Sequence, residues 1–341
     1  MAESILFLAH TEDDGTLSKA TLEALGAAVA FRDATGAAMA VGLVGGEVAG
    51  AAAAIGGCGA TRFLAVAGPP FAAARYATDA ASAEALARAS GATLVFVPGT
   101  SRWSRVVAGV AHRLGGRADT HVTSLAAEGG AVTVTRWYYR QRMEAALTRT
   151  ERPWVIAIDP GAAPAWSGVA GAPAVDMVPV ALPPGGVRTE VAGFRAPASD
   201  QQTIRPDAAL LFVAGAGWTK KQADGETHLT EAESIIRGFL DRSQASLGGS
   251  KSLVDQSGEG QAVLHFMTHL NQVGQTGSTP RHPKGLATCC HGEEPHVVGW
   301  RFISERRAVN LDPNCGWARG KADVVYVADA FEVMRKVNEM L

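Results

Sequence analysis

The sequence contains little that would place the chain in a membrane, in an oxidising compartment or on nucleic acid. It lacks a run of about 18 apolar residues, which a membrane-spanning helix needs. Its apolar start, MAESILFLAH, is too short and too acidic at its flanks for a signal peptide. Four cysteines are too few for a disulfide framework in a chain of 341 residues. A net charge of −2 gives no electrostatic reason to expect a nucleic-acid partner. We therefore expect a cytoplasmic protein without a membrane span.

The motifs of several enzyme classes are missing too. The sequence has no GxSxG, no Ser-His-Asp arrangement, no GxxxxGK[ST] loop and no convincing pair of carboxylates. It therefore gives no support for a hydrolase or a kinase.

Glycine and hydrophobic residues are abundant, with 39 glycines and a hydrophobic fraction of 47%. This composition favours an α/β protein with many tight turns. The length exceeds the usual size of one hydrophobic core, so two domains are expected. In the first half, strand-like runs alternate with helical patterns, which predicts a mostly parallel, doubly wound sheet like those of nucleotide-hydrolase-like domains. The runs lie at 5–9, 38–44, 93–97, 131–139 and 154–158, and the helical patterns at 17–34, 47–56, 79–90 and after Gly99.

The composition changes after Asp159. Eight of the 16 prolines lie between Pro160 and Pro206, which excludes a helix or a central strand and predicts a connector over a surface, at about 160–206. A second α/β pattern follows, with a strand and glycine turn at 210–217, a helix at 229–241, strands near 285–290, 307–311 and 323–328, and a last helix at 330–341. The predicted domains are 1–198 and 199–341.

The densest chemical signal is Gln272-Val273-Gly274-Gln275-Thr276-Gly277, where two glycines let the backbone approach a planar or phosphorylated ligand. It is followed by His291-Gly292, His296, the segment 310–313 (NLDP) and Ala328-Asp329. Polar residues at successive strand ends are where open parallel sheets bind nucleotides.

The order and spacing of these segments resemble those of the electron-transfer flavoprotein alpha subunits. That family carries QVGQTG, SGAIQH, NKDP and ADLF, and this chain has QVGQTG (272–277), HGEEPH (291–296), NLDP (310–313) and ADAF (328–331). The resemblance extends more loosely over the whole chain. It implies FAD on the C-terminal parallel sheet, a heterodimer with a beta subunit, a donor dehydrogenase and a downstream electron acceptor.

The resemblance also implies roles for residues. Gln275 and Thr276 would contact the flavin ring, His296 would lie near its pyrimidine O2, and Asn310 and Asp329 would hold the adenosine end. Ser250 and Lys251 fall where the family has a Ser-Arg pair. The complete set of predicted cofactor residues is Gly217, Trp218, Ser250, Lys251, Gln272, Val273, Gly274, Gln275, Thr276, Gly277, His291, Gly292, His296, Asn310, Asp312 and Asp329.

The chain departs from the family pattern at two places. In the family, the turn GGRG carries an arginine beside the flavin, and this chain has Gly217 at that position. Lys220 or Lys221 would therefore have to supply the positive charge. Trp218 could pack on the flavin ring. His291 replaces a serine. These changes suggest a divergent branch that serves a specialised dehydrogenase.

Two other clusters have a metal interpretation and a simpler one. Cys289, Cys290 and Cys315 stand near two histidines, but they lack the CxxC spacing of zinc and iron–sulfur sites, and buried cysteines are common at the end of an apolar run. His265 and His269 have the spacing of a helical metal pair, but no third ligand is evident. Ordinary burial is favoured for the cysteines, a solvent-facing or packing role is favoured for the two histidines, and Cys58 is expected to be structural.

The aromatic-basic stretch 137–142 could suit nucleic acid, but a strand against the partner subunit or the other domain fits the near-neutral charge better. Three functions remain open. The favoured one is an electron carrier. The alternatives are a flavin-dependent or nicotinamide-dependent oxidoreductase that acts directly on a small molecule, with only His291 or His296 as acid or base, and a scaffold that has lost its cofactor.

Overall fold

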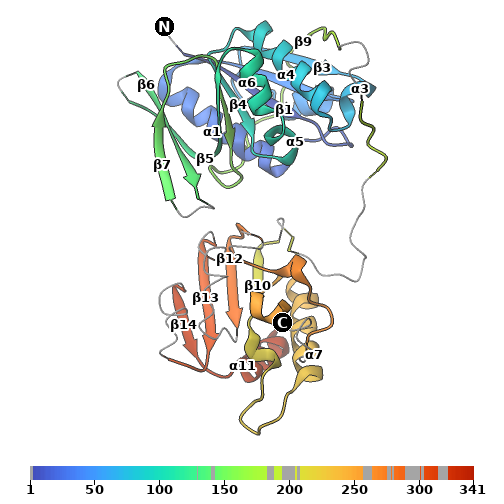
Figure 1. Cartoon of the computed structure of the whole chain (residues 1–341), viewed down its shortest axis with the longest axis vertical. Helices are drawn as coiled ribbons and strands as arrows, with labels where there is room; N and C mark the ends of the chain where they lie inside the picture. Colours follow the sequence, from blue (N-terminus) through green and yellow to red (C-terminus); the bar gives the residue numbers. More distant parts are fainter. Residues whose placement is uncertain are drawn as a thin grey trace. The chain divides into compact units, whose positions relative to one another are not determined.

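The computed structural model divides the chain into two compact units, Met1–Phe194 and Arg195–Leu341. The domain boundary expected from the sequence lay between residues 198 and 199. Each unit has its own sheet (Figure 1). The structure describes residues 3–128, 130–139, 143–182, 188–193, 204–205, 208–255, 263–274, 278, 280–288, 300, 303–313 and 322–341.

The first unit is built on a nine-stranded sheet with the order β7-β6-β5-β8-β4-β1-β2-β3-β9. All neighbours from β5 to β9 in this order are parallel, whereas β5, β6 and β7 pair antiparallel and form a ribbon at one side of the sheet (Figure 1). The sheet is therefore mixed. Its strands are β1 Ser4–His10, β2 Ala38–Gly45, β3 Arg62–Ala67, β4 Leu94–Pro98, β5 Arg117–Glu128, β6 Ala131–Tyr138, β7 Met143–Thr148, β8 Trp154–Ile158 and β9 Val175–Met177.

Helices cover both faces of this sheet and enclose two hydrophobic cores. Leu25 and Phe31 of α1 belong to the core on one face, and Leu86 of α4 and Val110 of α6 to the core on the other. This is the doubly wound arrangement that the alternating pattern predicted. The helices are α1 Lys19–Thr35, α2 Ala49–Ala54, α3 Pro69–Ala72, α4 Tyr76–Ser90, α5 Ser101–Ser104 and α6 Val107–Arg113.

The first part of the predicted connector is fastened to this unit by backbone hydrogen bonds. Trp166 N donates to Leu22 O at 2.9 Å, Gly57 N donates to Val169 O at 3.0 Å, and Gly171 N donates to Ala53 O at 2.8 Å. The segment then adds β9 beside β3 as an edge strand. A surface path was expected, but this strand was not, because three residues (VDM) are too few to show an alternating pattern.

The second unit is built on a five-stranded sheet with the order β11-β10-β12-β13-β14, in which every pair of neighbours is parallel. The helices α7 and α11 lie together on one face of it (Figure 1) and share a core with Phe212 and Leu247. This confirms the predicted second parallel sheet. The elements are β10 Leu210–Ala214, η1 Ala216–Thr219, α7 Leu229–Ser243, β11 Ser246–Gly249, α8 Lys251–Asp255, η3 His269–Asn271, β12 Lys284–Thr288, β13 Glu305–Asn310, β14 Val324–Val327 and α11 Ala330–Met340.

None of the helices in the described part of the chain is long and apolar enough to cross a bilayer. The aromatic-basic stretch begins on β6, where the guanidinium of Arg136 lies 4.5 Å from the ring centre of Tyr138. Tyr139 follows with 73% of its surface exposed, and residues 140–142 lie outside the described residues.

Candidate functional site

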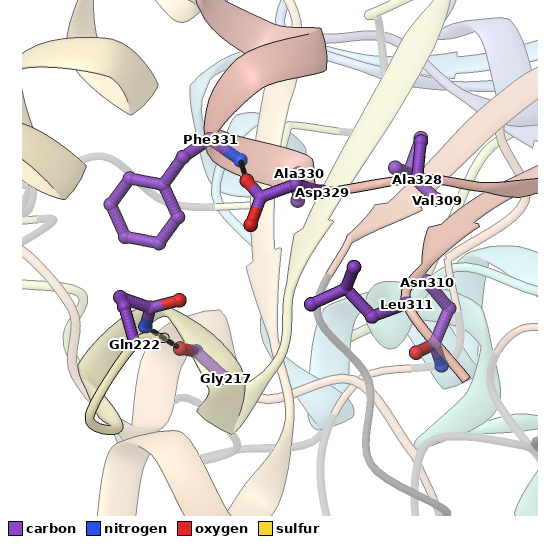
Figure 2. A pocket seen from close by; sticks show the side chains of 9 residues that line it. All are labelled: Gly217, Gln222, Val309, Asn310, Leu311, Ala328, Asp329, Ala330 and Phe331. Atoms are coloured by element: carbon purple, nitrogen blue, oxygen red, sulfur yellow. Dashed lines mark hydrogen bonds between the residues drawn. The ribbon is translucent and has the colours of Figure 1, made fainter. Parts of the chain in front are cut away.

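A pocket in the second unit lies where β10, β13 and β14 end. It is lined by Gly217 from the turn after β10, by Asn310 at the end of β13 and by Asp329 at the start of α11, together with Gln222, Val309, Leu311, Ala328, Ala330 and Phe331 (Figure 2). Counted with the solvent that enters it, the open space is about 320 Å³. Three residues from separate parts of the sequence that were expected to hold a cofactor thus meet in one pocket.

Local hydrogen bonds fix the two polar side chains at the ends of β13 and β14. Asp329 caps α11, since one of its oxygens accepts from Phe331 N at 2.7 Å and from Glu332 N at 3.1 Å. Asn310 Oδ1 accepts from Asp312 N at 3.1 Å. Both side chains are therefore held in place before a ligand arrives, and in Figure 2 the second Asp329 oxygen faces the pocket.

Gln222 lines the pocket although no sequence motif predicted it as a site residue. Its Nε2 donates to Gly217 O at 3.1 Å and to Lys220 O at 2.7 Å. These two hydrogen bonds fix the turn after β10 at the edge of the pocket. The residue starts a small hairpin-like loop, closed by a bridge between Lys221 and Thr227. The signal for this loop is the pair Asp224-Gly225, which is typical of tight turns.

The turn after β10 orients Gly217 and Trp218 differently. Gly217 lines the pocket, whereas the Trp218 indole is fully buried. It packs at a 49° tilt against Phe331 with ring centres 4.5 Å apart, and it donates Nε1–H to Thr288 Oγ1 at 2.8 Å. A ligand in this pocket therefore meets the backbone of Gly217 and not the indole. Gly217 was expected beside the flavin ring, but it shares its pocket with Asn310 and Asp329, which were expected at the adenosine end.

A second group of predicted residues lies at the end of β11. Ser250 is buried; its N–H donates to Ala214 O at 3.0 Å, and its Oγ accepts from Leu253 N at 3.2 Å. Lys251, next in the chain, is exposed. Val273 N donates to Gly249 O at 3.0 Å, which brings the start of the QVGQTG segment to this strand end.

Gly274 in that segment has φ of 136°, a conformation that glycine adopts easily. Gln272 and Val273 are buried. The remaining predicted residues lie outside the described residues. They are Gln275, Thr276, Gly277, His291, Gly292, His296, Cys289, Cys290 and Cys315.

Within the described ranges, no group of three or more His, Cys, Asp or Glu side chains is arranged to hold a metal ion. His265 lies in a turn and His269 begins η3, so the two histidines do not share one α-helix, as a helical metal pair requires. Cys58 is a free, buried cysteine, which agrees with a structural role, and burial raises the pKa of its thiol.

The first unit also has a pocket beyond the ends of β1 and β2, with an open space of about 510 Å³ when the entering solvent is counted in the same way. Its lining includes Glu12, Asp13, Asp14 and Glu47. Four carboxylates repel phosphate groups, so this pocket does not suit a dinucleotide.

A family model described as "Electron transfer flavoprotein domain" matches residues 5–183, just over half of the chain. The chain belongs to the electron transfer flavoprotein family. Membership implies a flavin protein that works with partner subunits, but the match does not distinguish an alpha from a beta subunit, and it ends before the second unit. A search of the curated proteins found no match.

Proposed function

We propose that this electron transfer flavoprotein chain is the alpha subunit of a heterodimer that holds FAD on its second unit. In this role it takes electrons from a partner dehydrogenase and passes them to a downstream acceptor, with no substrate chemistry of its own. The site residues are those predicted above, now with Gln222 and Leu311 added at the pocket.

The observation that carries this proposal is the meeting of Gly217, Asn310 and Asp329 in one pocket beside the last strands of a parallel sheet. Asp329 caps α11 with one carboxylate oxygen only, and its second oxygen faces this pocket (Figure 2), where a ligand can donate to it. Ligands of open parallel sheets bind at this edge, beyond the carboxyl ends of the strands. The polar groups here, which are two side-chain amides, a carboxylate that accepts hydrogen bonds, and backbone groups, suit a nucleoside.

The extent of the sheet edge supports a dinucleotide over a mononucleotide. Asp329 follows β14 at one side of the sheet, whereas Ser250 and Gln272 lie by the end of β11 at the other side. With about 4.8 Å between neighbouring strands, these positions are separated by roughly 19 Å across the sheet. An adenosine at β14 and a flavin ring near β11 would use both groups of predicted residues.

Bound FAD would supply one- and two-electron chemistry, and the chain's own residues would orient it. A cation near the ring favours the reduced, anionic form. Lys251 directly follows Ser250 at the end of β11, so it is a better placed candidate for that charge than Lys220 or Lys221, which follow β10 on the pocket side.

The test is a visible absorption spectrum of the chain purified with its second subunit, recorded during stepwise reduction. Bands close to those of free FAD, which bleach as electrons are added, are expected, with about one FAD per heterodimer released on denaturation. A colourless complex that does not take up added FAD would refute the proposal.

A further inference from the structure

Building on that proposed function, we infer that Gln222 selects adenine at the pocket of the second unit. Its amide oxygen would accept a hydrogen bond from the exocyclic amino group of the base. Gln222 would thus make the site specific for an adenine dinucleotide over one with a carbonyl at the same position of the base.

The orientation of the Gln222 amide follows from its neighbours. One terminal atom of the side chain lies 3.1 Å from Gly217 O and 2.7 Å from Lys220 O, both of which are backbone carbonyl oxygens. Only the NH₂ group can donate to two carbonyls, so that atom is the nitrogen and the other is the oxygen. Figure 2 shows this oxygen directed away from Gly217 and into the pocket. Its position is fixed because both amide hydrogens are engaged.

The loop that carries Gln222 is held by its own contacts. Gln222 N donates to Glu226 O at 2.8 Å, and Gly225 N donates to Gln222 O at 2.9 Å. Next to the loop, His228 Nε2 lies 2.7 Å from Asp224 Oδ2, and the His228 ring packs edge-on against Phe331. The amide oxygen is therefore preorganised, which is the condition for a hydrogen bond to discriminate between ligands.

Two of the polar groups that face the pocket are hydrogen-bond acceptors, so the pocket suits a ligand that carries hydrogen-bond donors. The Gln222 oxygen and the Asp329 carboxylate both accept, and none of the described residues that line the pocket is a lysine or arginine. A phosphate would be repelled, whereas an amino group and ribose hydroxyls can donate to these oxygens. Leu311, with 60% of its surface exposed, offers an apolar face to a flat base. Adenosine satisfies these requirements better than a guanine or hypoxanthine nucleoside, whose carbonyl would face the Gln222 oxygen.

The test compares FAD with flavin hypoxanthine dinucleotide, in which a carbonyl oxygen replaces the adenine amino group. Apoprotein of the full chain with its second subunit is titrated with each flavin, and binding is followed by quenching of flavin fluorescence. We expect the wild-type protein to bind FAD roughly 10- to 100-fold more tightly, because the analogue leaves an acceptor facing an acceptor. In Gln222→Met, which removes both hydrogen-bonding groups, the preference is expected to fall to about twofold. Glu226→Gln, on the same loop, should leave it unchanged.

The outcomes separate the two proposals. If the wild-type complex binds neither flavin, the proposed function fails. If it binds both equally, or if Gln222→Met weakens both by the same factor, FAD binding stands and the selection by Gln222 is overturned. The wild-type comparison needs no variant, so the inference stays testable even if Gln222→Met folds poorly.

Discussion

Asp119 is a buried carboxylate that joins the antiparallel ribbon of the first unit to its parallel strands. Its side chain, 1% exposed, accepts from Arg136 Nη1 at 2.8 Å, from Arg149, and from Trp154 Nε1 at 2.9 Å. Burial alone would raise the pKa of Asp119, but the hydrogen bonds from Arg149 and Trp154 and the nearby charge outweigh it and hold the pKa below its usual 3.8.

We predict that Asp119→Ala lowers the free energy of unfolding of the first unit by about 3 kcal/mol, because it leaves buried donors without an acceptor. The measurement is urea unfolding. Asp176→Asn, at an exposed pair with Arg62, is the control and should cost less than about 1 kcal/mol. The wild-type contribution should be complete above pH 3.8 and be lost as the pH falls below it, since the folded pKa is the lower one. Equal losses in the two variants would contradict this account.

His10, at the end of β1, should make the first unit sensitive to mild acid. The side chain is 8% exposed, and burial together with the Arg102 guanidinium lowers the pKa of His10 to about 4. The unfolded chain therefore binds a proton below pH 6.5 that the folded chain does not, so stability is full above pH 6.5 and falls by up to about 3 kcal/mol as the pH drops to 4.

Unfolding midpoints measured from pH 7.5 to 4 should show this loss in the wild-type protein and a flatter profile in His10→Gln. His112→Gln, on the exposed surface of α6, should keep the wild-type slope. A wild-type slope in His10→Gln would assign the acid sensitivity to other groups.

Lys251 is expected to set the redox behaviour of the flavin. Lys251→Gln should lower the reduction potential, since removing a cation close to a forming anion costs on the order of 1 kcal/mol. The potential is measured by titration against a reference dye. Lys284→Gln is the control, because Lys284 begins β12 at the opposite end of the strands. An unchanged potential in Lys251→Gln would exclude this role.

At the scale of elements, α1 and the connector depend on a glycine. A methyl group at Gly26 would lie 2.2 Å from Pro164 O, so Gly26→Ala should destabilise the first unit by about 1–3 kcal/mol although alanine favours helices. Gly50→Ala in α2, where the nearest atom is 4.0 Å away, should instead stabilise by up to about 1 kcal/mol. The measurement is the thermal unfolding midpoint of both variants. If Gly26→Ala raised the midpoint, the connector at Pro164 would have moved to make room for the methyl group.

The sequence predicted the elements that carry a strong periodic pattern and missed those formed by tertiary packing. α7 and β4 were predicted nearly to their ends, whereas β11 (SLGG) was missed because two of its four residues are glycines, which disfavour strands. Packing explains one of these glycines: a methyl group at Gly248 would lie 2.6 Å from Val273 Cγ2. The glycine lets the QVGQTG segment approach the sheet.

The residues of the candidate site could also be predicted only in part, namely those that belong to a sequence motif. Asn310 and Asp329 were predicted as site residues because they sit at strand ends with a family spacing, and both line the pocket. Gln222 was not predicted as a site residue. It lies in a loop that is closed by a bridge between Lys221 and Thr227, and the family motifs do not include this loop. The buried position of Trp218 also depends on packing against Phe331, which no local pattern reveals.

At the scale of the whole molecule, the two units have separate hydrophobic cores. In the described part of the chain, the buried residues of the first unit's cores end at Ile158, with partly buried residues up to Val180 packed against them, and those of the second unit begin at Leu211, with Ile204 packed against them. The two cores of each unit share one sheet and so belong to one cooperative unit of unfolding, and we therefore expect two calorimetric transitions, one for each compact unit.

FAD should raise only the transition of the second unit, because a ligand stabilises the folded unit that binds it. At a free concentration of 100 times Kd the gain is about 2.7 kcal/mol. Asp119→Ala should lower the other transition alone, which identifies it independently of the flavin. The experiment is differential scanning calorimetry of the apoprotein with and without FAD, and of the variant. If FAD moved the transition that Asp119→Ala lowers, the cofactor would bind to the first unit, and the placement of FAD on the second unit would be wrong.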